Sequence, residues 1–222
     1  MVDLIHGLSA ETVRANLERV QRRLAEAGRR PGEVQILAAV KYLPAEELGA
    51  LAAGGITLVG ENRAQALVAK APAHPELTWD FIGVLQSRKV AQIVPHVRYI
   101  HSVASESVLA QLAKHARPDT RVLIEINIAG EAGKDGISPA QLPEFLERCP
   151  APVVGLMTMP PLAADPEHSR RYFAALRELA ERHGLRELSM GTSQDYGVAA
   201  EEGATIIRLG SLLYHAVGES TP

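Results

Sequence analysis

Residues 34–41 read Val-Gln-Ile-Leu-Ala-Ala-Val-Lys, an apolar run that ends abruptly at a lysine. A run of this length, rich in aliphatic and β-branched side chains, predicts a buried strand. Similar runs follow along the chain at residues 56–59, 78–82, 97–100, 122–126, 153–156, 188–190 and 205–209. A stretch typical of a helix separates each run from the next, so strands and helices alternate from residue 34 onward.

This alternation indicates βαβ units and a parallel sheet. Eight units fit a single α/β domain that spans residues 1–222 and folds as a (β/α)8 TIM barrel. An open, doubly wound sheet is the alternative. An N-terminal helix is expected at about residues 9–27, because apolar residues recur there at helical spacing between a capping Ser9 and Gly28.

The composition excludes several classes of protein. The chain has 222 residues, 46% of them hydrophobic and 22% charged, which is ordinary for a globular protein. Its 23 Lys and Arg against 26 Asp and Glu give a net charge of −3, so no nucleic-acid or membrane partner is expected. The single cysteine, Cys149, excludes an intrachain disulfide and favours a reducing compartment. With no apolar stretch of spanning length and no basic leader, a soluble cytoplasmic protein is expected.

In barrels of this kind, the functional groups lie at the carboxyl ends of the strands. Lys41 stands at such an end, directly after the first apolar run. A lysine at the inner end of a buried strand is partly desolvated, which favours the neutral amine that adds to a carbonyl group. The alternative is a lysine whose long side chain simply reaches solvent.

Two glycine-containing turns lie after the last two runs, at Gly191-Thr192-Ser193 and Gly210-Ser211. Glycine lets the backbone approach an anion closely, and the loops after strands seven and eight of such barrels commonly hold phosphate. The two turns together indicate a phosphorylated ligand, although the sequences G-x-x-x-x-G-K-S/T and G-x-G-x-x-G are absent. His101, expected at the end of the fourth strand, has no partner at metal-binding spacing, so no metal site is expected.

Several segments together resemble one known family. They are Leu37-Ala38-Ala39-Val40-Lys41, Gly60-Glu61-Asn62, the run from Phe81 to Lys89, Gly155-Leu156-Met157, Leu188-Ser189-Met190-Gly191 and Arg208-Leu209-Gly210-Ser211. In order and spacing they are similar to the YggS/PROSC family of pyridoxal-5′-phosphate (PLP) homeostasis proteins. That family resembles the N-terminal barrel of alanine racemase, the fold type III group of PLP proteins, without that enzyme's C-terminal β-domain.

The resemblance implies a role for eight residues. Lys41 matches the lysine that holds PLP as a Schiff base, and Arg208 matches the arginine that faces the pyridine nitrogen. The other matching positions are the phosphate-holding Ser193, Gly210 and Ser211, Asn62 near the 3-hydroxyl group, and Met157 and Met190 where the ring packs.

This chain departs from the family's usual pattern at a few positions. Asp80 stands where the family usually has His before Phe-Ile-Gly, and Tyr196 and Tyr214 lie in runs that differ from the usual Ser-Asp-Asp-Met and Ile-Phe-Gly. Arg63 replaces a frequent Tyr. We expect these changes to affect contacts at the rim only, because none of them replaces the lysine, the arginine or the phosphate glycine.

The resemblance implies a protein that holds PLP covalently on Lys41 and passes it on. Its partners would be PLP and PLP-dependent apoenzymes, and a monomer is expected. The alternatives are a fold type III amino-acid racemase and a Schiff-base aldolase or phosphate-substrate barrel without PLP.

We expect a carrier rather than an enzyme. Permanently charged Arg208 would oppose protonation of the pyridine nitrogen, which weakens PLP as an electron sink. Racemisation also needs an acid or base on each face of the α-carbon. If the first strand continues, Tyr42 points away from Lys41, while Tyr196 and Tyr214 have no predicted place.

Overall fold

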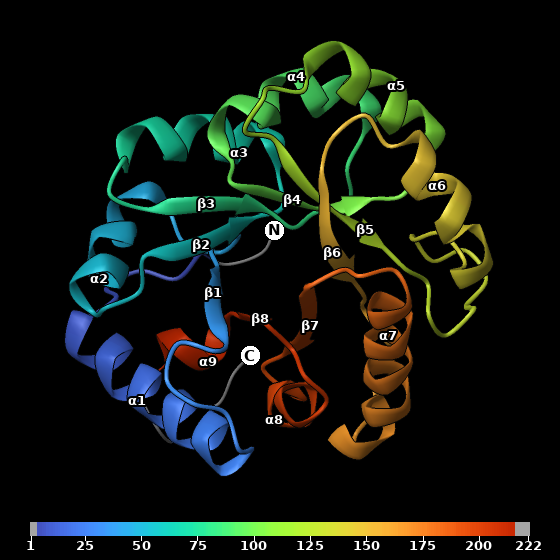
Figure 1. The fold of residues 1–222 in the computed structure, drawn as a ribbon. Helices are drawn as coiled ribbons and strands as arrows, with labels where there is room; N and C mark the ends of the chain where they lie inside the picture. The colour runs from blue at the N-terminus through green and yellow to red at the C-terminus, as the bar shows by residue number, and fades with distance from the viewer. Residues whose placement is uncertain (1–3, 216–222) are drawn as a thin grey trace.

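The computed structural model describes residues 4–215. Its strands are β1 (Gln35–Ala39), β2 (Leu58–Glu61), β3 (Thr78–Phe81), β4 (Tyr99–Val103), β5 (Arg121–Glu125), β6 (Val153–Met157), β7 (Glu187–Thr192) and β8 (Ile206–Leu209). They close into one parallel barrel in chain order, with β1 paired to β8, and the helices surround it (Figure 1). The predicted (β/α)8 barrel is confirmed, and the pairing of the first strand with the last excludes the open sheet.

The helices lie between the strands and cover the outside of the barrel. They are α1 (Ala10–Glu26), α2 (Leu48–Ala53), α3 (Ala64–Lys70), α4 (Val90–Ile93), α5 (Glu106–His115), α6 (Leu142–Arg148), α7 (Arg170–Arg182), α8 (Tyr196–Glu201) and α9 (Ser211–Tyr214). The boundaries of α1 follow the prediction: the Ser9 hydroxyl accepts a hydrogen bond from the Thr12 N–H, and Gly28 has a positive φ of 78° just past the end. No helix within residues 4–215 is long and apolar enough to cross a membrane.

β4 lies further along the chain than the sequence indicates. The apolar run predicts a strand at 97–100, whereas the observed strand is Tyr99–Val103. The polar residues His101 and Ser102 continue the strand because both find buried partners: the Ser102 hydroxyl donates to the Gly83 carbonyl, and the His101 ring bonds within the barrel. His101 is therefore a fully buried residue in the middle of β4 and not a strand-end residue.

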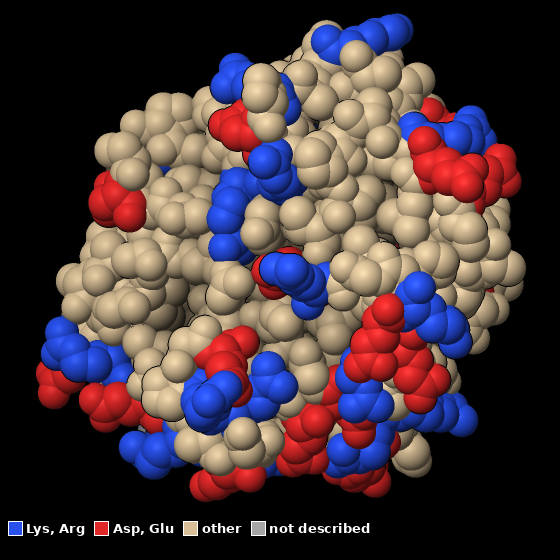
Figure 2. Space-filling view, viewed as in Figure 1, with Lys and Arg blue, Asp and Glu red and all other residues tan. Residues whose placement is uncertain are grey.

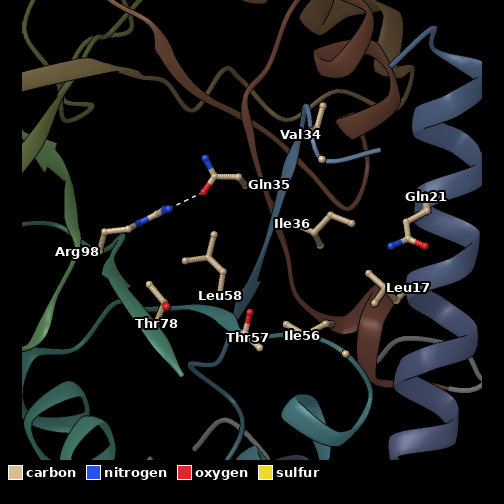
Figure 3. Close-up of a pocket in the computed structure, with 12 residues that line it drawn as sticks. Leu17, Gln21, Val34, Gln35, Ile36, Ile56, Thr57, Leu58, Thr78 and Arg98 are labelled. Carbon is tan, nitrogen blue, oxygen red and sulfur yellow. Dashed lines mark hydrogen bonds between the residues drawn. The ribbon is translucent and has the colours of Figure 1, made fainter. Parts of the chain in front are cut away.

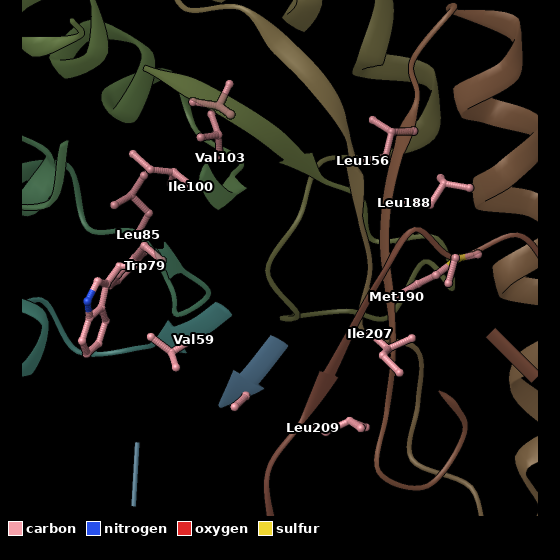
Figure 4. Close-up of a cluster of buried hydrophobic side chains, with 14 of the residues drawn as sticks. Val59, Trp79, Leu85, Ile100, Val103, Leu156, Leu188, Met190, Ile207 and Leu209 are labelled. Carbon is pink, nitrogen blue, oxygen red and sulfur yellow. The ribbon is translucent and has the colours of Figure 1, made fainter. Parts of the chain in front are cut away.

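The apolar core is a layer between the strands and the helices. Val59, Trp79, Ile100, Met190 and Ile207 belong to it, and Figure 4 shows these side chains on the outer sides of their strands. The interior of the barrel is different, because four polar side chains meet there. They are Asp80, His101, Ser189 and Arg208, each at most 7% exposed. A polar interior is stable only if its groups are hydrogen-bonded, and the site is built on those bonds.

Charged side chains are of mixed sign over the surface shown in Figure 2. Acidic and basic groups are interspersed along the lower edge of that view, over α1, α8 and α7. Arg170 alone contacts Glu167, Glu201 and Glu202 there. Alternating signs of this kind form surface ion pairs along that edge, while basic groups gather through the middle of the view.

Candidate functional site

Lys41 lies in a turn directly after β1. The turn is held from two sides: the Val40 N–H donates to the Gly60 carbonyl, and the Lys70 ammonium donates to the Val40 carbonyl at 2.9 Å. Lys70 is itself paired at 2.7 Å with Glu61, whose side chain is fully buried. This buried ion pair fixes the backbone next to Lys41, so the half-buried Lys41 amine projects from a rigid support.

Tyr42 is placed differently from the expectation. β1 ends at Ala39, so the alternation of strand side chains stops before Tyr42 and the ring does not point away from Lys41. The Lys41 ammonium lies over the Tyr42 ring, with Nζ 4.5 Å from the ring centroid. Tyr42 therefore forms part of the wall beside the lysine.

Asn62 begins the loop after β2. One carboxylate oxygen of Glu61 accepts the N–H groups of both Asn62 and Arg63, which fixes this loop, so Glu61 caps the turn. The Asn62 side-chain oxygen is buried and has no hydrogen-bond partner within residues 4–215. A buried carbonyl oxygen without a partner costs free energy, and a ligand that donates a hydrogen bond to it would remove that cost.

Gly83, after β3, packs directly against Asn62. A Cβ at this position would lie 2.2 Å from the Asn62 carbonyl oxygen and 2.6 Å from its Cα. We predict that Gly83→Ala displaces the Asn62 loop and lowers the free energy of unfolding by about 1–3 kcal/mol, as overpacking against backbone does. Urea unfolding measures this. Gly49→Ala in α2 is the control, because nothing lies within 4 Å of its added Cβ. Equal stability of Gly83→Ala and the unmodified protein would contradict the contact.

Arg208 extends from β8 into the top of the barrel interior. Its Nη1 group donates to the carbonyl and hydroxyl oxygens of Ser189, and its Nη2 group donates to the Thr158 carbonyl and the Met159 sulfur. These contacts within the described chain use the four Nη hydrogens, so Nε–H is the donor left for a ligand. Burial lowers the pKa of Arg208 to about 10, and the carboxylates of Glu125 and Asp195 oppose that shift. The guanidinium is therefore charged at neutral pH.

Asp80 is not a rim residue. It is completely buried inside the barrel, where its carboxylate accepts hydrogen bonds from His101 Nε2 at 3.1 Å and from the Arg98 guanidinium at 2.6 and 3.1 Å. His101 Nδ1 in turn lies 2.9 Å from the Ser189 hydroxyl, which also bonds to Arg208. The expectation that this departure concerns only the rim is therefore wrong, because Asp80 connects to Arg208 through two side chains.

Gly191 and Thr192, expected in a turn after the seventh strand, are the last residues of β7, so the turn begins at Ser193. This turn and Gly210 lie at the carboxyl ends of β7 and β8, the open end of the barrel. The Ser193 hydroxyl lies 3.5 Å from the Gly210 amide, and Asp195 fixes the first turn by accepting from the Thr192 N–H and hydroxyl. A Cβ on Gly210 would meet nothing within 4 Å, so the space in front of this backbone is open. Ser211 follows as the first residue of α9.

The two methionines expected near a ligand lie on opposite sides of the barrel wall. Met157 pairs in register with Ser189, whose side chain points inward, so Met157 also faces the interior. Met190 follows Ser189 directly, is completely buried and packs in the outer apolar layer (Figure 4). The structure does not bring Met190 to the site, and we leave it out of the proposed ligand contacts.

Two tyrosines without a predicted place are engaged in structural contacts. The Tyr214 hydroxyl donates to the Ala39 carbonyl at 3.0 Å, and burial raises the pKa of this phenol well above its usual range. Tyr214 thus fastens α9 to the end of β1. Tyr196 packs against the apolar layer at the start of α8. Burial raises the pKa of its hydroxyl group, and Arg23 and Arg19 of α1 oppose this shift.

Glu125 is a site residue that sequence reasoning missed. It ends β5, pairs in register with Met157 and is 9% exposed, so it faces the interior close to the open end. Burial, reinforced by Asp135, raises its pKa to about 7, while Arg208 and Lys134 oppose the shift. The available signal was a glutamate inside an apolar run, which is rarely tolerated without a reason.

Seven of the eight residues expected at the site thus share the open end of the barrel. They are Lys41, Asn62, Met157, Ser193, Arg208, Gly210 and Ser211. This end combines a lysine after β1, an arginine on β8 and small-residue turns after β7 and β8. That combination defines a barrel of the alanine racemase type, and the family model "Alanine racemase, N-terminal domain" matches residues 8–217.

The chain belongs to the family of pyridoxal phosphate homeostasis proteins, as the sequence resemblance indicates. It is 39% identical over 213 residues to the pyridoxal phosphate homeostasis protein of Aquifex aeolicus, a match that covers 89% of this chain and 93% of that protein. The Pseudomonas aeruginosa protein of the same name is 35% identical, with 95% and 98% covered. PipY of Synechococcus elongatus, solved with PLP bound, has 30% identity and a TM-score of 0.77, over 91% of this chain and 100% of PipY.

Proposed function

We propose that this protein binds PLP at the open end of the barrel, with the aldehyde bonded covalently to Lys41, and that it takes part in intracellular PLP homeostasis. The observation that carries the proposal is the convergence of four complementary groups: the Lys41 amine, the unpartnered buried oxygen of Asn62, the Arg208 guanidinium and the open backbone at Gly210. Each suits one part of PLP, so the residues present fit this cofactor.

Each residue has a distinct task in holding PLP. Lys41 forms a carbon–nitrogen double bond with the aldehyde carbon, and the aldehyde oxygen leaves as water. The Asn62 side-chain oxygen accepts a hydrogen bond from the 3-hydroxyl group, and the Arg208 Nε–H donates to the pyridine nitrogen. The backbone at Gly210 and Ser211 and the Ser193 hydroxyl hold the phosphate. Met157 packs beside the ring from the interior face.

We propose a carrier in the cytoplasm, with PLP-dependent apoenzymes as recipients and a monomeric state. PLP is a weaker electron sink when its pyridine nitrogen is not protonated. Arg208 is charged and held by four hydrogen bonds, so it donates to that nitrogen and opposes a second positive charge beside it. Like charges in hydrogen-bond contact repel by roughly 5 kcal/mol at an effective dielectric constant near 20.

A racemase of the same fold is the rival function, and α-proton exchange separates the two. The Tyr214 hydroxyl is already bonded to the Ala39 carbonyl and Tyr196 packs against the apolar layer, which supports the absence of a second acid or base opposite Lys41. We predict that exchange of the α-proton of alanine or serine with solvent deuterium, followed by NMR, stays barely above that of free PLP. Rapid exchange with inversion, abolished by Lys41→Ala, would establish a racemase; Tyr42 would then be the first residue to replace.

The phosphate contacts predict a preference for PLP over pyridoxal. Ser193→Ala should weaken PLP binding by roughly 1.5–3 kcal/mol, the usual contribution of a hydrogen bond to a charged group, and leave pyridoxal binding nearly unchanged. Gly210→Leu should abolish the preference, because its side chain would fill the open space at this backbone. Absorbance titrations with both compounds measure this. Equal affinities of the unmodified protein for PLP and pyridoxal would refute the phosphate site.

The direct test of the proposed function is an absorption spectrum of the purified protein with PLP, recorded before and after borohydride. We expect a visible band that borohydride removes, with the label recovered on a peptide that contains Lys41. A label on another lysine would refute the assignment. A protein without a PLP chromophore would favour the aldolase alternative.

A further inference from the structure

A continuous line of hydrogen-bonded side chains crosses the barrel from one end to the other. It begins at Gln35, whose side-chain oxygen accepts from Arg98 Nη1 at 2.5 Å beside a cavity of about 390 Å3 at the amino ends of β1, β2 and β3 (Figure 3). It continues through Asp80, His101 and Ser189. It ends at Arg208, at the opposite end of the barrel.

The direction of every hydrogen bond in this line is fixed by chemistry. Asp80 has a lowered pKa and only accepts, so His101 Nε2 carries the proton between them. Burial lowers the pKa of His101, so the ring is neutral and its Nδ1 accepts from the Ser189 hydroxyl. The Ser189 oxygen is then free to accept from Arg208. Each donor thus faces an acceptor, and reversing any one bond would leave two donors or two acceptors facing each other.

We propose that Asp80, His101 and Ser189 act as one unit, the interior relay, which positions the Arg208 guanidinium for the pyridine nitrogen of PLP. This inference rests on the proposed function. The hydroxyl and carbonyl oxygens of Ser189 accept hydrogen bonds from Arg208 Nη1 at 2.6 and 2.7 Å. These two bonds set the plane of the guanidinium and the direction of its Nε–H. The Ser189 hydroxyl proton points away from Nη1 when His101 Nδ1 accepts it, and Nδ1 is an acceptor when Asp80 holds the ring in its Nε2–H form.

Asp80→Asn tests this coupling with almost no change in shape. Both oxygens of Asp80 accept from donors: one from Arg98 Nε and the Tyr99 N–H, the other from Arg98 Nη2 and His101. The backbone N–H cannot reverse, so the new NH2 group faces both Arg98 Nη2 and His101 Nε2. Of these two partners only His101 can become an acceptor, by moving its ring proton to Nδ1. The Ser189 hydroxyl proton then turns toward Arg208 and repels Nη1.

The experiment combines NMR on the PLP-free protein with PLP titrations. The His101 ring nitrogens, identified by their loss in His101→Gln, should report a neutral Nε2–H form that becomes Nδ1–H in Asp80→Asn. Asp80→Asn and Ser189→Ala should each weaken PLP binding about tenfold or more and shift the absorption maximum of bound PLP. The double variant should be no weaker than the worse single variant, because the two residues act through one line. Thr120→Val, which removes a buried hydroxyl in the loop before β5, should bind PLP as the unmodified protein does.

Circular dichroism shows whether each variant is folded, and Ser189→Ala carries the test if Asp80→Asn is not. Unchanged affinity and spectrum in folded Ser189→Ala, or strictly additive losses in the double variant, would overturn the interior relay while PLP binding stands. Failure of the unmodified protein to bind PLP would overturn the proposed function, and the positioning role with it.

Discussion

Lys41→Ala is expected to abolish covalent attachment of PLP and the visible band that accompanies it. Affinity should fall by roughly two orders of magnitude or more, because the rigid turn after β1 holds the amine next to the aldehyde. The expected loss is larger than for any single hydrogen bond in the site. Absorbance titration and mass spectrometry after borohydride measure both effects.

The control for this experiment is Lys114→Ala, which removes an exposed lysine from the last turn of α5. It should leave the spectrum and the affinity unchanged. A Lys41→Ala protein that keeps its PLP band would show that the lysine after β1 does not carry the cofactor.

Glu125→Gln is expected to stabilise the PLP-free protein above pH 7 and to have no effect near pH 4.5. The folded-state pKa is about 7 and the ordinary value is 4.5, so between these values the folded state holds a proton that the unfolded state has lost. Stability therefore falls as pH rises through this window, by about 3 kcal/mol in total. Glutamine cannot ionise and avoids that loss.

Urea unfolding of the unmodified protein and Glu125→Gln at pH 5 and pH 8 measures the difference. At pH 8 the variant should be more stable by about 3 kcal/mol, or by roughly 6–12 °C in Tm for a domain of this size. Glu181→Gln, which removes an exposed carboxylate from α7, should show no such dependence. Equal stability of Glu125→Gln and the unmodified protein at pH 8 would show that Glu125 is not a buried, destabilising charge.

The parts of the site that could be predicted from sequence are local in the chain. Lys41 ends an apolar run, and Ser193 and Gly210 follow the last two strands, so strand counting alone places them at one end of a barrel. The resemblance supplied Asn62, Met157 and Arg208, which have no distinctive local pattern.

The interior of the barrel could not be predicted, because its contacts join residues from separate strands. Asp80, His101 and Ser189 lie on β3, β4 and β7, and the register that brings them together is fixed only when the barrel closes. The apolar run at 97–100 even placed β4 two residues early. The two faces of β7 likewise depend on register, which is why Met190 could not be assigned to the outer layer from sequence.

The ion pair between buried Asp80 and partly exposed Arg98 limits how this family can vary. A relative with histidine at the position of Asp80 would place an imidazole against the guanidinium of Arg98, and two buried cationic or donor groups in contact are costly. We therefore expect the two positions to change together. A relative with histidine at the position of Asp80 should have an acidic residue at the position of Arg98. Asp80, where this chain departs from its family, would then be one of two linked substitutions, and aligned sequences should show changes at the positions of Asp80 and Arg98 together.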